Sequence, residues 1–157
     1  MISKPQGGGS VGILEAGDVD LEPLVDMFNA YRVFYGCDPD LQSASSFVTR
    51  MLQERTTRFF LATVGGRVVG FMHLLPSFDT LAMRQAWILE DLFIEPGYRR
   101  RGVGAALLAH AEIVARGTYA ARITLSTAHT NVTAQRLYSA HGYVLDEVFR
   151  TYHRVLQ

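Results

Sequence analysis

The segment from Leu89 to Gly104 constrains the fold most, because it joins a strand to a helix through a basic loop that contains glycine. Apolar and aromatic residues over Gln85–Ile94 predict a strand. Glu95-Pro96-Gly97 then breaks the strand, and apolar residues at helical spacing begin after Gly102. Such a chain packs helices against a sheet, so the segment predicts a mixed α/β protein.

Hydrophobic periodicity predicts the other elements. The helices are expected over Leu21–Tyr35, with Asp18 or Asp20 as the N-cap, and over Ser43–Gln53, Gly102–Arg116 and Thr130–His141. The strands are expected over Val11–Glu15, Arg58–Val64, Arg67–Leu75, Gln85–Ile94 and Arg122–Thr127, with a final strand or hairpin arm over Tyr143–Arg154. A Gly-Gly pair between the second and third strands indicates a hairpin turn. This order predicts one central, largely antiparallel sheet.

Length and composition indicate one globular domain. The 157 residues correspond to a single domain, with 48% hydrophobic and 19% charged residues. Residues 11–157 are expected to form that domain. Residues 1–10, which contain Gly7-Gly8-Gly9-Ser10, are expected to be a flexible tail.

Charge and cysteine content exclude several functional classes. Fifteen basic residues balance fifteen acidic ones, so no overall field draws the chain to nucleic acid or to a membrane. Cys37 is the only cysteine, and the five histidines lack metal-ligand spacing, so we expect no disulfide and no metal site. No stretch has the length of a membrane span and no signal peptide opens the chain, so we expect a cytoplasmic protein.

The basic loop predicts an anion site. A helix start presents unpaired backbone N–H groups and the positive end of its dipole. Gly102 and Gly104 allow a phosphate to approach the backbone, and Arg99–Arg101 add positive charge beside it. The alternative is that three solvated arginines happen to precede a helix with incidental glycines.

A second pattern lies on the last predicted helix. Asn131, Ala134 and Tyr138 occur at i, i+3 and i+7 and therefore share one helix face. Gly142 is the expected left-handed C-cap, and Tyr143 can pack back on the helix. The alternative is that Tyr138 is a buried aromatic and that Asn131 only caps the helix.

The two patterns together resemble the GNAT superfamily of N-acetyltransferases. Arg99-x-x-Gly102-x-Gly104 is similar to its R/Q-x-x-G-x-G/A pyrophosphate loop, and Leu89–Pro96 is similar to its fourth strand. The segment from Asn131 to Tyr143 resembles its second motif, N-x-x-A-x-x-L-Y-x-x-x-G-F/Y. The resemblance covers about Phe59 to Tyr143. It implies a mixed, mostly antiparallel sheet with splayed fourth and fifth strands and helices on both faces.

The resemblance implies an enzyme that moves the acetyl group of acetyl-CoA directly to a primary amine. The expected cofactor-binding residues supply backbone groups to the pantetheine arm, cradle the pyrophosphate or contact the arm from the last helix; they are Leu92, Phe93, Ile94, Arg99, Arg100, Arg101, Gly102, Val103, Gly104, Ala105, Asn131 and Tyr138. Tyr138 is also the expected acid for the leaving thiolate, because a phenol and a thiol have comparable pKa values.

Glu90 is the candidate general base for the incoming ammonium. Its Leu-Glu-Asp context is similar to that of polyamine acetyltransferases. Asp91 alternates with Glu90 along the strand, so only one of the two is expected to face the acceptor cleft. The alternative for Glu90 is a surface ion pair with an arginine.

The acceptor pocket is expected to contain Tyr31, Tyr35 and Trp87 beside Glu90, because aromatic walls attract cationic amines. Core packing is the alternative for each aromatic. A small molecule is the expected acceptor, and a protein N-terminus or lysine is the alternative. A CoA-binding module without catalysis is a second hypothesis, and the presence of Tyr138 and Glu90 favours the enzyme. Dimers are common among relatives, so a homodimer is also a hypothesis.

Overall fold

The computed structural model describes residues 9–156, which fall into two compact units divided between Ser126 and Thr127. We describe each unit by itself. The predicted N-terminal tail lies outside the described residues up to residue 8. Gly9 and Ser10 are exposed and belong to no helix or strand.

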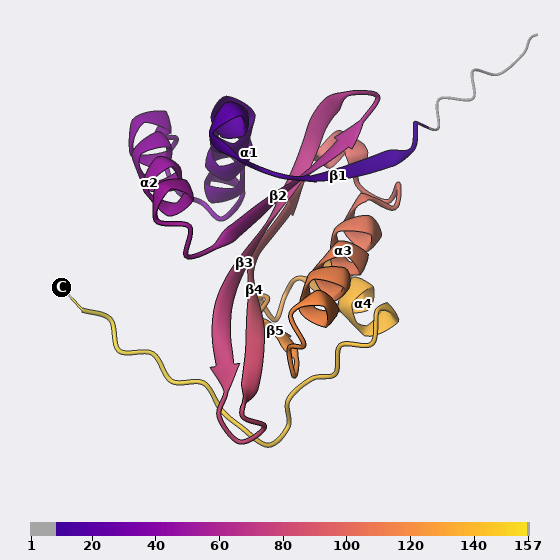
Figure 1. Cartoon of the computed structure of the whole chain (residues 1–157). Coiled ribbons are helices and arrows are strands. Elements are labelled where there is room, and N and C mark those ends of the chain that lie inside the picture. The colour runs from indigo at the N-terminus through magenta and orange to yellow at the C-terminus, as the bar shows by residue number, and fades with distance from the viewer. Residues whose placement is uncertain (1–8, 157) are drawn as a thin grey trace, which may run out of the picture. The chain divides into compact units, whose positions relative to one another are not determined.

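The first unit is built on a five-stranded mixed sheet (Figure 1). The strands follow the chain in the order β1-β2-β3-β4-β5, with antiparallel pairing except between β4 and β5, which are parallel. Their bounds are β1 Val11–Glu15, β2 Arg58–Val64, β3 Arg67–Asp79, β4 Arg84–Ile94 and β5 Ile123–Leu125. The predicted, largely antiparallel α/β sheet is confirmed.

Helices cover both faces of this sheet (Figure 1). On one face, α1 (Leu21–Phe34) and α2 (Leu41–Glu54) bury Leu24 and Val48 against Phe59 and Phe71. On the other face lies α3 (Val103–Gly117), which is reached from β4 through a short 3-10 turn, Pro96–Tyr98. Burial of these large side chains supplies most of the free energy that holds the layers together.

Local chemistry explains where two elements depart from the predicted bounds. The α2 helix begins two residues early because the Asp40 side chain accepts a hydrogen bond from the Ser43 N–H and caps the helix. The β3 strand runs on to Asp79 because β4 pairs with it as far as Arg84.

The second unit contains α4 (Val132–Ala140). Over its described residues, 143–156 form no helix or strand, so the prediction of a final strand over Tyr143–Arg154 is wrong. A strand needs a paired neighbour as well as an alternating sequence. Here the Asp146 carboxylate instead accepts hydrogen bonds from the backbone N–H groups of Val148 and Phe149, which turns the chain locally.

Candidate active site

Glu90 occupies a β-bulge in β4. Asp91 pairs with His73 and Leu89 pairs with the next residue of β3, Leu74, so Glu90 is an extra residue without a partner across the ladder. Its side chain is exposed, whereas Leu89 and Asp91 on either side of it are buried. A bulge redirects the side chain it carries, and here it presents a carboxylate to solvent between two buried residues.

Asp91 belongs to a buried polar cluster. Its Oδ2 lies 3.0 Å from Nδ1 of His73, and only 11% of the Asp91 side chain is exposed. The carboxylate also accepts a hydrogen bond from the Tyr31 hydroxyl. Burial first, and this hydrogen bond second, raise the pKa of Tyr31, so its hydroxyl stays protonated. As expected, one of the two adjacent acids is exposed and the other is enclosed.

Tyr31 and Tyr35 lie together at the end of α1. Their ring centroids are 5.0 Å apart in an edge-to-face arrangement, and Tyr31 also contacts the rings of Phe71 and Phe93. Tyr35 is half exposed, so the cluster runs from the core to the surface. The structure thus brings two of the three predicted acceptor residues together with Asp91.

Trp87 does not join this cluster. It is 4% exposed, and its indole Nε1–H donates a hydrogen bond of 2.9 Å to Oγ1 of Thr118, just beyond α3. The bulge at Glu90 explains the separation. It shifts the alternation of β4 by one residue, so Trp87 faces α3 while Asp91 and Phe93 face α1.

The head of α3 offers backbone donors. Its N-cap, Gly102, has φ +80°, and no side chain caps the helix. A Cβ at Gly102 would meet no atom within 4 Å, so the space beside the first amides is open. Arg100 before it also has a positive φ, +61°. Such a turn directs successive N–H groups toward one point, which suits a diphosphate.

The three loop arginines differ in placement. The Arg99 Nε–H donates to the Ile94 carbonyl oxygen at 2.9 Å, and its guanidinium lies over the rings of Phe34 and Phe93. The Arg101 guanidinium lies 5.4 Å from the centre of the Tyr98 ring. All three arginines are exposed. Their charge therefore surrounds the head of α3, while the Arg99 side chain also braces the loop.

The far end of β4 has one side without a strand partner in the described chain. The β4–β5 ladder pairs only Trp87, Ile88 and Leu89 with β5. From Asp91 to Ile94, β4 pairs with β3 alone. The predicted splay of the fourth and fifth strands matches this short ladder. Leu92–Ile94 thus present a strand edge that can pair with an extended group.

In the second unit, α4 carries the other predicted residues. The Asn131 side chain accepts a hydrogen bond from the Ala134 N–H and caps the helix. Gly142 ends it with φ +82°, as predicted, and the rings of Tyr138 and Tyr143 are 6.0 Å apart. Asn131 therefore has the capping role that the sequence left open, and Tyr138 is half-buried in its unit.

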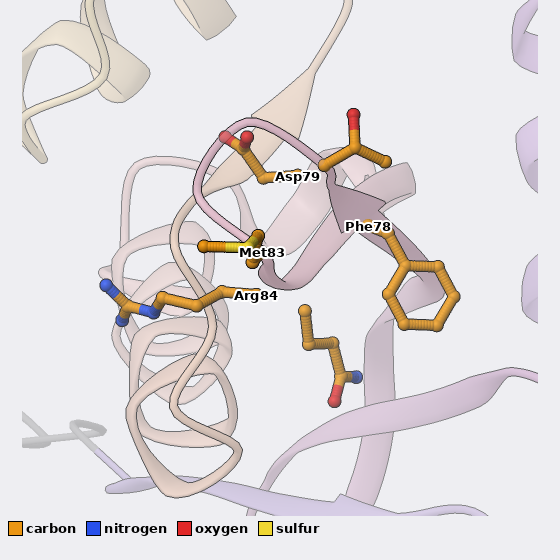
Figure 2. A pocket seen from close by; sticks show the side chains of 6 residues that line it. Phe78, Asp79, Met83 and Arg84 are labelled. Atoms are coloured by element: carbon orange, nitrogen blue, oxygen red, sulfur yellow. The ribbon is translucent and has the colours of Figure 1, made fainter.

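A shallow pocket of about 350 Å³ lies elsewhere, at the β3–β4 hairpin (Figure 2). Phe78, Asp79, Met83 and Arg84 line it. Asp79 forms an ion pair with Arg122, and Arg84 donates to two backbone carbonyls that follow α3. It holds none of the predicted site residues. Across residues 9–156, no group of three metal-ligating side chains and no helix fit to span a membrane occurs.

Comparison with known proteins agrees with this geometry. The family model described as Acetyltransferase (GNAT) family matches residues 24–143. YhfO of Bacillus subtilis (strain 168), an uncharacterized N-acetyltransferase, is 35% identical over 142 residues, which cover 90% of this chain and 95% of that protein. A probable acetyltransferase of Haemophilus influenzae is 25% identical over 117 residues, covering 74% and 80%.

Solved structures show the same fold. The crystal structure of a probable acetyltransferase matches with a TM-score of 0.88 and 33% identity, over 93% of this chain and 98% of that one. The crystal structure of a ribosomal-protein-alanine N-acetyltransferase from Brucella melitensis matches with a TM-score of 0.78 at 16% identity, over 94% and 100%. The chain is therefore a member of the GNAT acetyltransferase family, and it is an acyltransferase.

Proposed function

We propose that this enzyme binds acetyl-CoA at the head of α3 and transfers its acetyl group to the primary amine of a small, cationic molecule. The family uses acetyl-CoA. The observation that carries the proposal is the left-handed Gly102, which leaves open space beside helix amides that no side chain caps. Those amides and the flanking arginines fit a diphosphate in both charge and hydrogen bonding.

Two further parts of the chain fit the rest of acetyl-CoA, which supplies the acetyl thioester when bound. The strand edge at Leu92–Ile94 offers backbone groups to the pantetheine arm. The loop and helix start, from Arg99 to Ala105, hold the phosphates. In this proposal the Arg99 side chain acts on the loop through Ile94, and Asn131 contacts the arm from α4.

The reaction needs one proton acceptor and one proton donor. The amine attacks only when neutral, so the Glu90 carboxylate takes a proton from the ammonium, directly or through water. Its exposed position on the bulge supports this role, and Glu90 forms none of the ion pairs found among residues 9–156. The Tyr138 hydroxyl gives its proton to the leaving sulfur. Backbone N–H groups of β4 stabilise the charge that develops on the carbonyl oxygen.

The acceptor lies beside the end of α1 in this proposal. Tyr31 and Tyr35 supply aromatic surface, and the neighbouring carboxylates of Glu90 and Asp91 supply negative charge. Both features favour a protonated amine. Trp87 is left out of this wall because its indole is engaged with Thr118. A cytoplasmic location and a homodimer stay predictions.

An amine panel tests the proposal. Purified protein is mixed with acetyl-CoA and with diamines, amino-acid amines, aminoglycosides or peptides, and thiol release is followed together with the mass of the amine product. We expect turnover with small cationic amines. Turnover on peptides alone would favour a protein acetyltransferase. Binding of CoA without turnover on any amine would favour a non-catalytic module, and absence of CoA binding would refute the proposal.

A further inference from the structure

His73 and Asp91 are the polar side chains that the described core encloses almost fully, with 3% and 8% of each residue exposed. The His73 ring also stacks on Phe59, at 3.9 Å between centroids and 9° between planes. Burying a charged pair costs free energy, and apolar residues of similar volume would often be at least as stable. The pair is therefore expected to have a role besides stability.

The hydrogen bonds of this pair define how it is held. Asp91 Oδ2 can only accept when ionised, so His73 donates through Nδ1–H and keeps its lone pair on Nε2. Nε2 is buried and has no hydrogen-bond partner among the described residues. The His73 ring is thus fixed on one side by Asp91 and on its face by Phe59, with one orientation available.

The pair stands at the bulge that carries Glu90. His73 and Asp91 are directly paired across β3 and β4, and the next ladder pair, Leu74 with Leu89, lies beyond the bulge. Asp91 also accepts the hydrogen bond from Tyr31 of α1. One carboxylate therefore links the strand position next to the proposed base with a tyrosine of the proposed acceptor site.

We propose that His73 is a positioning residue: by holding the Asp91 carboxylate at the edge of the bulge, it keeps Glu90 and Tyr31 in one fixed arrangement around the acceptor amine. This inference rests on the proposed function. Displacement of a reacting group by about 1 Å can cost about a hundredfold in rate, so a side chain that never touches substrate can still control kcat.

Three variants separate the hydrogen bond from the packing. His73→Phe keeps an aromatic ring on Phe59 but removes the donor to Asp91. His73→Asn places an amide N–H near the position of Nδ1 and restores the donor. The double variant His73→Phe, Asp91→Leu leaves no buried charge alone, so it remains folded if the single Phe variant does not.

Steady-state kinetics with the full chain give the first measurement. In His73→Phe we expect kcat/KM for the amine to fall about tenfold to a hundredfold, with KM for acetyl-CoA within about twofold of wild type. His73→Asn should recover most of the loss, and the double variant should match His73→Phe. Wild-type kcat/KM in His73→Phe or in the double variant, or equal losses in the Phe and Asn variants, would overturn the proposal.

Amide hydrogen exchange over residues 89–92 gives a measurement that does not depend on activity. Exchange should be faster in His73→Phe than in wild type, and near wild type in His73→Asn, because the bulge loses its clamp only in the first. If the wild-type enzyme acetylates no amine, the proposed function fails and the exchange data alone decide. Unchanged exchange in His73→Phe would show that His73 does not hold the bulge.

Discussion

The Nε atom of Arg99 lies 2.9 Å from the carbonyl oxygen of Ile94, and this hydrogen bond fastens the loop before α3 to the end of β4. The same guanidinium lies 5.0 Å from the centre of the Phe34 ring and 5.8 Å from that of Phe93. An arginine that the sequence assigns to phosphate binding thus also connects α1, β4 and the head of α3. Its contribution to acetyl-CoA binding is expected to come largely from holding the loop.

Arg99→Ala should raise KM for acetyl-CoA about twofold to tenfold, the range expected for one lost hydrogen bond. The increase should change little with ionic strength, because the lost contact is not with the phosphates. Arg101→Ala is the control, since loss of an exposed positive charge near the phosphates should matter less at high salt. An effect of Arg99→Ala that disappears at high salt would contradict this interpretation.

Tyr138→Phe should lower kcat about a hundredfold or more while KM for acetyl-CoA changes little, because a general acid acts in the transition state. Tyr143→Phe is the matched control, since its ring lies 6.0 Å from that of Tyr138 in the same unit. Single-turnover and steady-state rates of both variants give the comparison. An unchanged kcat in Tyr138→Phe would remove this residue from the acid role.

Glu90→Gln should lower activity chiefly at low pH. There the acceptor amine is fully protonated and needs a base, whereas above a pH of about 10 it loses the proton unaided. The kcat/KM of the variant should therefore approach that of wild type as the pH rises. Glu22→Gln, an exposed carboxylate on α1, is the control. A constant ratio of the two enzymes at every pH would leave Glu90 without a role as base.

Stability should also depend on His110. Burial, and then the charge of Arg58, lower the pKa of His110 in the folded chain. The unfolded chain therefore binds a proton more readily, so this contribution to stability is present above a pH of about 6.5 and is lost below it. In His110→Gln, the free energy of unfolding should fall less steeply between pH 7 and pH 5. Equal slopes in urea titrations of both proteins would contradict this.

Sequence alone predicts the parts of the fold that depend on local signals. The bounds of β1 and β2 agree with the alternation of apolar residues, and the turn between β2 and β3 agrees with Gly65-Gly66, both of which have positive φ. Gly102 and Gly142 adopt the left-handed conformation expected beside helix ends. Each of these features needs only neighbouring residues in the chain.

The bulge at Glu90 could not be predicted in the same way. A bulge is defined by the register of two strands that are distant in sequence, and it reverses the face of every residue beyond it. For that reason Trp87 lies under α3 although its position in the alternation groups it with Asp91. The His73–Asp91 pair was missed for the same reason, because His73 carries no local signal beyond its place in a strand.

Binding of acetyl-CoA to wild type, Gly102→Ala and Gly66→Ala, measured by calorimetric titration, tests the central claim most directly. Gly102 and Gly66 both have φ +80° and open space for a Cβ, so the two substitutions impose the same backbone strain. Gly102 lies at the proposed diphosphate site and Gly66 lies in the β2–β3 turn. We expect tight binding to wild type and to Gly66→Ala, and at least about tenfold weaker binding to Gly102→Ala. Equal affinity of Gly102→Ala and wild type would show that the head of α3 does not hold the diphosphate.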